Sequence, residues 1–201
     1  MLRNTSKIAS KLMLKKNLLA MALVFGSAAI SAQASAESYF GGSVGRTNWD
    51  FSCAGSTSCQ KAAGSWKLYG GFDFSPYFAV EGSYIYMNEV GANDSVVKAT
   101  FNARGADVAA VGKTPAWKGL HGFAKVGATF MKGEIIASFG DLSGSETHYS
   151  AQPLIGIGAS YQLDKKMSVR LELDTRKVKI SNVADTTYNV RNFSVGIQSV
   201  F

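Results

Sequence analysis

The sequence predicts an all-β protein, an eight-stranded antiparallel up-and-down transmembrane β-barrel formed by residues 37–201. Three observations support this fold class. Residues 1–36 have the three parts of a secretory signal peptide. The rest of the chain contains eight segments in which large apolar residues alternate with charged or small ones. The connections between these segments are short and long in turn, as in a barrel with turns at one rim and loops at the other.

The first 36 residues predict export. Residues 1–16 carry five basic side chains and no acid, residues 18–30 form an apolar run of 13 residues, and Ala34 and Ala36 form an A-x-A cleavage pattern. A transmembrane anchor is the alternative, but it needs about 20 apolar residues. We therefore expect a signal peptide over 1–36 and one barrel domain over 37–201.

The charge balance changes when the leader is removed. The whole chain has 21 basic and 14 acidic residues, a net charge of +7, and the five basic residues of the leader account for most of that excess. Residues 37–201 have a net charge of +2. The high isoelectric point therefore gives no support for nucleic-acid binding, and none is expected.

Eight strands are expected from the alternation, with Pro76 in a tight turn between the second and the third. The connections after the second, fourth and sixth strands are short. Those after the first, third, fifth and seventh are longer and polar, including a predicted loop over residues 132–150. The predicted strands are residues 39–49, 65–74, 77–87, 101–113, 120–131, 153–163, 167–178 and 188–201.

The alternation does not by itself show which face points inward. In the seventh segment, Val169 and Leu171 lie on one face, and Arg170 and Glu172 lie on the other. A soluble lipocalin-like barrel would turn the apolar row inward, and a membrane barrel would turn it outward. Aromatic residues near the strand ends and small residues on the charged face favour the membrane. In this register Arg104 faces lipid, which is tolerated near an interface.

If the charged face points inward, it brings four basic and four acidic residues into the lumen. An eight-stranded barrel is just wide enough to be filled by its own side chains, and buried charges must be paired. We therefore expect a salt-bridge network and no open solute pore; a wet lumen with loosely solvated charges is the alternative. The predicted network comprises Lys67, Asp73, Glu81, Lys125, Arg170, Glu172, Asp174 and Arg176.

Both cysteines, Cys53 and Cys59, lie in the exported part of the chain. Two close cysteines in an exported protein predict one disulfide, with two free thiols as the alternative. In the entropy model this small loop would stabilise the fold by about 2 kcal/mol.

Four stretches resemble the OmpA-like family of outer-membrane barrels. WKLYGGFDFSPYFAVEGSY, residues 66–84, is similar to the second hairpin of that family. YFGGSVGRTNW, residues 39–49, resembles its first strand, and GFAKVGATF, residues 122–130, resembles its fifth. SVGIQSVF, residues 194–201, is similar to the terminal signal that the barrel assembly machinery recognises. The resemblance covers essentially all of residues 37–201.

The resemblance implies a Gram-negative outer membrane, periplasmic turns, surface loops and an interior ion-pair cluster in which Glu81 faces Lys125 and Arg170. It implies outer-membrane lipid and lipopolysaccharide as surroundings, the barrel assembly machinery as a partner during biogenesis, and an extracellular partner for the loops. Many members carry a peptidoglycan-binding domain after the barrel, and none is expected here. The Cys53–Cys59 loop also departs from the family. The assembly signal would comprise Phe193, Val195, Ile197 and Phe201.

No catalytic, cofactor or metal site is predicted. His148, near Glu146 and Ser150, is the one candidate for a lipid-modifying hydrolase, but the stretch has no recognisable triad spacing. GIGAS at residues 156–160 lacks the last glycine of a dinucleotide motif. The function expected is that of a small structural barrel, contributing to envelope integrity, adhesion or narrow ion conductance. A lipocalin-like binding barrel and a lipid-modifying enzyme are the alternatives.

Overall fold

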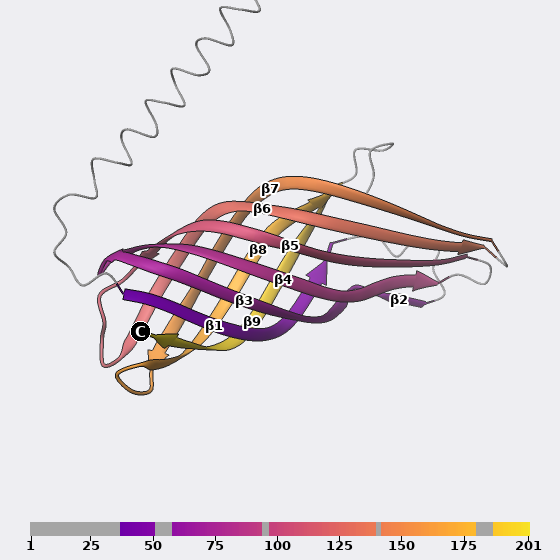
Figure 1. The fold of residues 1–201 in the computed structure, drawn as a ribbon. Helices are drawn as coiled ribbons and strands as arrows, with labels where there is room; N and C mark the ends of the chain where they lie inside the picture. The colour runs from indigo at the N-terminus through magenta and orange to yellow at the C-terminus, as the bar shows by residue number, and fades with distance from the viewer. Residues whose placement is uncertain (1–36, 51–57, 94–96, 140–141, 180–186) are drawn as a thin grey trace, which may run out of the picture. The chain divides into compact units, whose positions relative to one another are not determined.

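The computed structural model describes residues 37–50, 58–93, 97–139, 142–179 and 187–201. Within these ranges the chain is almost entirely β-strand, and no helix there is long and apolar enough to cross a membrane. The strands, shown in Figure 1, are β1 (Glu37–Trp49), β2 (Ser58–Gln60), β3 (Ala62–Ser75), β4 (Phe78–Asn93), β5 (Val97–Lys113), β6 (Leu120–Phe139), β7 (Leu142–Gln162), β8 (Met167–Lys179) and β9 (Thr187–Val200).

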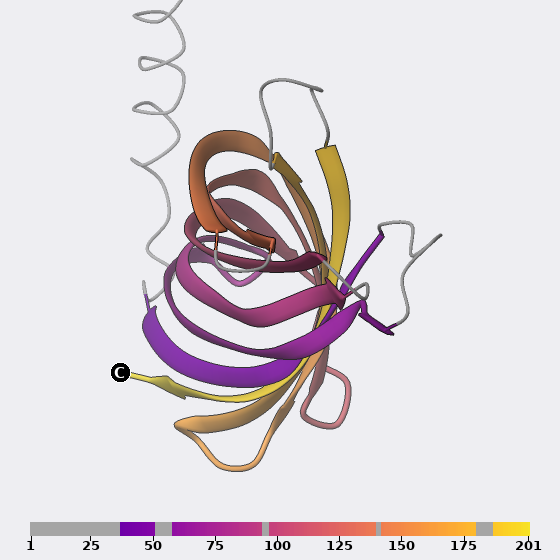
Figure 2. The ribbon, with the colours of Figure 1, turned by 90° about the vertical axis from the view of Figure 1, so that its right-hand side faces the viewer.

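Eight of these strands close into an antiparallel barrel (Figure 2). The order around the ring is β1, β3, β4, β5, β6, β7, β8 and β9, and β9 pairs back onto β1. Val44 in β1, for example, lies opposite Trp66 of β3 on one side and Val195 of β9 on the other. The short β2 pairs with the end of β4. Closure gives each barrel strand two neighbours, as the sequence predicted.

One rim, here called the turn end, has short connections stabilised by local hydrogen bonds. Ser75 Oγ accepts hydrogen bonds from two following backbone amides at 3.3 and 3.0 Å. Asp164 accepts two more, at 2.7 and 2.8 Å. The turn between β5 and β6 contains Lys118 and Gly119 with φ of 51° and 82°, a left-handed conformation that favours glycine. The opposite rim is called the loop end.

The wall of the barrel is taller on one side than on the other. Strands β4 to β7 have 16 to 21 residues, whereas β1, β3, β8 and β9 have 13 or 14. Figure 1 shows β5, β6 and β7 reaching farther toward the loop end than β8 and β9. The prediction of a long loop over residues 132–150 was wrong, because β6 and β7 stay paired as far as Phe139 and Leu142.

The physical reason for this error lies in the surroundings of the extension. Its outward residues, such as Lys132, Glu134 and Thr147, are polar, so the apolar row that marks a lipid-facing strand is missing there. Backbone pairing does not need that row. The stretch around Gly91 was likewise predicted as loop and belongs to β4.

The large apolar side chains point out of the barrel, and the charged ones point in. Val44, Val126 and Ile155 are each more than 60% exposed, while Arg170 and Glu172 are buried. A soluble lipocalin-like barrel would have the opposite arrangement, so that alternative is not favoured. An exposed apolar surface around a closed barrel matches the lipid-facing band of an outer-membrane protein.

Candidate functional site

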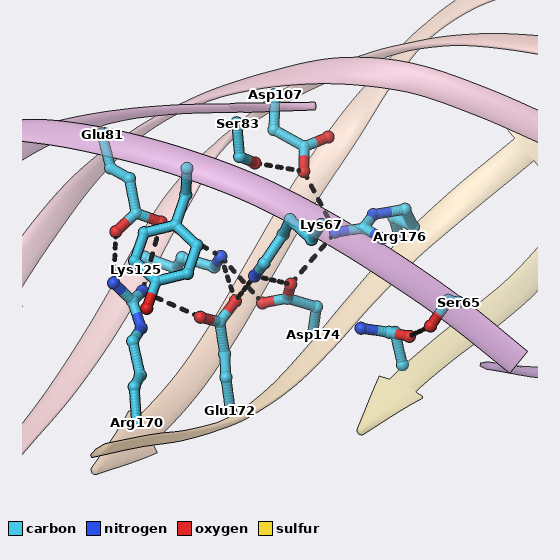
Figure 3. Close-up of polar contacts among 12 residues, drawn as sticks. Ser65, Lys67, Glu81, Ser83, Asp107, Lys125, Arg170, Glu172, Asp174 and Arg176 are labelled. Atoms are coloured by element: carbon cyan, nitrogen blue, oxygen red, sulfur yellow. Dashed lines mark hydrogen bonds and ion pairs between the residues drawn. The ribbon is translucent and has the colours of Figure 1, made fainter. Parts of the chain in front are cut away.

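The middle of the barrel holds eight buried charged residues, here called the central ion cluster (Figure 3). Five strands contribute to it, and β8 alone supplies four residues at alternate positions. None is more than 4% exposed. With four basic and four acidic groups, the cluster is formally neutral, as burial of charge requires. Its members are Lys67, Glu81, Asp107, Lys125, Arg170, Glu172, Asp174 and Arg176.

Two carboxylates of β8 form the centre of the cluster. Glu172 accepts hydrogen bonds from both Lys67 and Lys125, and its other oxygen lies 2.8 Å from Arg170 Nη2. Asp174 lies 3.1 Å from Lys67 Nζ and 3.0 Å from Lys125 Nζ. Each lysine thus bridges both carboxylates, which ties β3 and β6 to β8 across the lumen.

The side of the cluster nearer the turn end is held by Glu81 and Arg170. Two guanidinium nitrogens of Arg170 donate to the two carboxylate oxygens of Glu81, at 2.5 and 3.2 Å. The Tyr39 hydroxyl donates to Glu81 at 3.0 Å. The guanidinium carbon of Arg170 lies 4.6 Å from the ring centre of Tyr69 and 4.2 Å from that of Phe123. Fork geometry and ring stacking suit arginine, so lysine would not replace it.

The side nearer the loop end is held by Arg176. Its Nη2 lies 3.1 Å from Asp174 Oδ2 and 3.1 Å from Asp107 Oδ2. Ser83 Oγ donates to Asp107 at 3.0 Å. The contacts therefore continue without interruption from Glu81 to Asp107, and a carboxylate is the last charged group at each end of the cluster.

A glycine makes room for the centre of the cluster. Gly156 in β7 lies directly between Lys125 of β6 and Asp174 of β8 in the paired strands. A Cβ atom at this position would clash with the side chains of both residues. Any larger residue would therefore force the side chains of Lys125 and Asp174 to shift.

Groups of apolar residues lie on both sides of the cluster. Toward the loop end, buried residues such as Trp49, Met87 and Met131 pack together. Toward the turn end, Tyr39 and Tyr69 pack together with smaller residues. The charged middle layer thus lies between two groups of apolar residues, and a cavity of about 320 Å³ at the turn end reaches Arg170. A lumen whose middle is filled matches the small interior of an eight-stranded barrel.

The structure brings together seven of the eight residues predicted for the lumen network. The exception is Asp73, whose oxygens lie 2.6 and 2.7 Å from Lys113 Nζ at the turn end. Asp73 has the correct inward phase, but it lies six residues from Lys67, roughly 20 Å along the strand. Its place in the cluster is taken by Asp107, which sequence reasoning missed. The signal was present, because Asp107 alternates with outward Ala106 and Val108 in β5.

Other predicted residues lie away from this cluster. Cys59 lies in β2, and Cys53 lies outside the described residues, so their disulfide stays a prediction.

His148 points into the loop end of the barrel, with Nε2 3.0 Å from Glu146. In the described ranges, no group of three or more potential ligands is placed to hold a metal. The predicted assembly row is outward and exposed: Phe193, Val195, Ile197 and Phe201.

Comparison with known proteins identifies the family. The model of the family described as "OmpA-like transmembrane domain" matches residues 33–200 of this chain. Ail, the attachment invasion locus protein of Yersinia pestis, superposes with a TM-score of 0.58 at 14% identity, covering 83% of this chain and 99% of Ail. Neisserial surface protein A gives a TM-score of 0.56 at 12% identity, covering 82% of this chain and 97% of its own.

A third similar structure is the outer-membrane protein OprG of Pseudomonas aeruginosa, with a TM-score of 0.56 at 10% identity, covering 83% of this chain and 96% of OprG. A sequence comparison with curated proteins finds no match. At these identities the structures show a shared fold, and the family match extends over most of the chain. The chain therefore belongs to the OmpA-like transmembrane domain family of outer-membrane β-barrels.

Proposed function

We propose that this protein is a structural, non-conducting outer-membrane barrel whose tall loop-end wall contacts the exterior. The observation that carries the proposal is the filled middle of the lumen. Eight buried charges are paired with one another, and an apolar layer covers them toward the loop end. A hydrated ion would have to displace this layer and break several ion pairs at once.

Planar-bilayer recording tests the closed lumen. Folded wild-type protein should give no steady conductance. The variant Arg176→Ala/Asp107→Ala keeps the net charge, removes one end of the cluster and serves as the sensitivity control. Steady ohmic conductance of the wild-type barrel, confirmed as folded by heat-modifiable gel mobility, would contradict the proposal.

The orientation of the barrel is part of the same proposal. Strands β6 and β7 extend the wall at the loop end, where Ser145 is exposed. Lys165 lies in an exposed turn at the other end. A membrane-impermeant maleimide added to intact cells should label Ser145→Cys and leave Lys165→Cys unlabelled. The reverse pattern would overturn the orientation. The wild type, which has only its two native cysteines, provides the background.

We also propose that the outward row ending at Phe201 is recognised by the barrel assembly machinery. Phe193 and Ile197 are 55% and 54% exposed on one face of β9, where an external protein can reach them. Phe201→Ala should lower the amount of folded protein in the outer membrane. Phe78→Ala, which truncates another exposed phenylalanine, in β4, is the control. Equal yields of the two variants would remove this assignment.

Finally, we propose that the barrel is not a lipid-modifying enzyme. Catalysis would need a serine hydroxyl hydrogen-bonded to the candidate base. Across the described ranges, Ser150 Oγ makes no hydrogen bond, and His148 Nε2 lies 3.0 Å from the Glu146 carboxylate instead of a serine hydroxyl. Replacing His148 with alanine should leave the lipid A composition of the cells unchanged, and an altered lipid A profile would support the enzyme alternative instead.

A further inference from the structure

Two cations lie side by side on the outer surface of the barrel. Arg104 of β5 and Lys132 of β6 are directly opposite each other in the paired strands. Their inward neighbours, Ala103 and Met131, are buried in the lumen, so strand alternation places both cations on the outward face. Two tyrosines complete this row, because Tyr86 lies opposite Arg104, and Tyr149 lies opposite Lys132.

This arrangement is unfavourable in the isolated protein. Like charges at directly opposite positions of an antiparallel pair repel each other. In the described part of the chain neither Arg104 nor Lys132 takes part in an ion pair, although Glu134 lies two residues from Lys132 on the same face and Glu89 lies in β4. The central ion cluster shows that this fold can pair its charges. An external anion would relieve the repulsion at this row.

An apolar groove lies next to the cations, on the side toward the middle of the barrel. Four outward residues on neighbouring strands form the groove, and each lies opposite the next: Tyr84, Ala106, Phe130 and Ala151. The alternation of rings and methyl groups leaves a groove of about 440 Å³, lined by this row together with Arg104, Lys132 and Tyr149. One end of the groove is therefore cationic, and the rest is apolar.

We propose that this groove binds a phosphate-bearing lipid, with the phosphate between Arg104 and Lys132 and an acyl chain along Phe130 and the two alanines. Arginine and lysine together match a phosphate, and an apolar groove matches hydrocarbon. The row lies where the exposed apolar belt gives way to polar residues, which is the depth of a headgroup. The assignment rests on the proposed orientation, which makes the lipid the lipopolysaccharide of the outer leaflet.

A comparison with a second outward groove shows what the pair of cations adds. A second outward groove of about 670 Å³, bounded by Val44, Trp66 and Ile197, is larger but has no outward-facing cation among its lining residues. It has the apolar character that any lipid-facing surface needs. Only the first of these two grooves combines that character with a pair of adjacent cations.

Binding of purified lipid A to the full-length mature barrel in phosphatidylcholine nanodiscs tests the proposal, with native mass spectrometry as the readout. Wild-type protein should retain bisphosphorylated lipid A and bind phosphatase-treated lipid A about tenfold less tightly, since hydrogen bonds to charged groups contribute that much. Arg104→Gln/Lys132→Gln should lose the same factor. The matched control is Arg46→Gln/Lys177→Gln, which removes two exposed cations from strands that do not pair with each other.

Equal affinity of the wild type for the two lipids, or equal weakening in both double variants, would overturn the lipid site. Either result would leave the barrel function intact, because the protein would still insert. A wild-type protein that fails to insert into lipid would instead overturn the proposed function. If Arg104→Gln/Lys132→Gln folds poorly, the single variant Lys132→Glu tests the lipid site instead. It creates an opposite-charge pair with Arg104, so the thermal stability should rise while phosphate-dependent binding is lost.

Discussion

Two sets of ion pairs in this barrel differ in their surroundings. The central ion cluster joins eight groups, none more than 4% exposed, through overlapping contacts. At the turn end, Asp73 and Lys113 form an isolated pair whose side chains are 22% and 20% exposed, with Lys113 also 4.9 Å from the ring centre of Tyr39. The chemistry of the two sets is the same, but only the second is partly exposed to solvent.

Burial makes the members of the central ion cluster depend on one another. In the central ion cluster three of the four carboxylates contact more than one cation, so removing one group leaves other charged groups that are buried from solvent. At the turn end, water solvates whichever partner remains. Single substitutions should therefore have large effects in the middle of the barrel and small effects at its rim.

The largest effect is expected for Glu172→Gln. Glu172 contacts Lys67, Lys125 and Arg170, so its neutralisation leaves the cluster with one excess positive charge. We expect a loss of about 3–5 kcal/mol in the free energy of unfolding. Guanidinium unfolding in lipid vesicles, followed by gel mobility, measures it. Glu89→Gln, at an exposed position, is the control. A loss below about 1 kcal/mol would show that the lumen is wet.

The second prediction concerns the coupling between Arg176 and Asp107, which the sequence did not reveal. Arg176→Met and Asp107→Asn should each destabilise the barrel, because each leaves an uncompensated charge. The double variant restores charge balance in the cluster, so its loss should be smaller than the sum of the two by about 1–3 kcal/mol. A double-mutant cycle from the same unfolding curves gives this value, and additive losses would speak against a shared network.

A smaller effect is expected at the turn end. Asp73→Asn removes the charge that faces Lys113 but leaves both residues in contact with water. We expect a loss of about 0–1 kcal/mol, which should shrink further in high salt. A loss comparable with that of Glu172→Gln would erase the contrast between the two regions.

The smallest effect is expected at Asp164, in the turn between β7 and β8. Hydrogen bonds from the backbone amides of Lys166 and Met167 lower the pKa of this carboxyl. A lowered pKa means that the carboxylate stabilises the fold above its ordinary range, near pH 4, and that this contribution is lost as the pH falls through the lower folded value. The stability difference between wild type and Asp164→Asn should therefore shrink on acidification. A difference that grows in acid would contradict this assignment.

Much of the barrel could be predicted from local pattern. Alternate residues of a strand face opposite sides, so the row Arg170, Glu172, Asp174 and Arg176 had to share one face wherever that face pointed. The turns at Pro76 and Asp164 and the eight strands follow from the same kind of reading. These features depend on a few neighbouring residues, which the sequence displays directly.

Other features depend on residues that are distant in the chain. The direction of the charged face, the replacement of Asp73 by Asp107, and the continuation of β6 and β7 through residues 132–139 and 142–150 all needed the closed barrel. Strand phase specifies the face on which a side chain lies. The height at which side chains from different strands meet is set by tilt and register, so only the tertiary structure could bring Asp107 to Arg176 and place Arg104 beside Lys132.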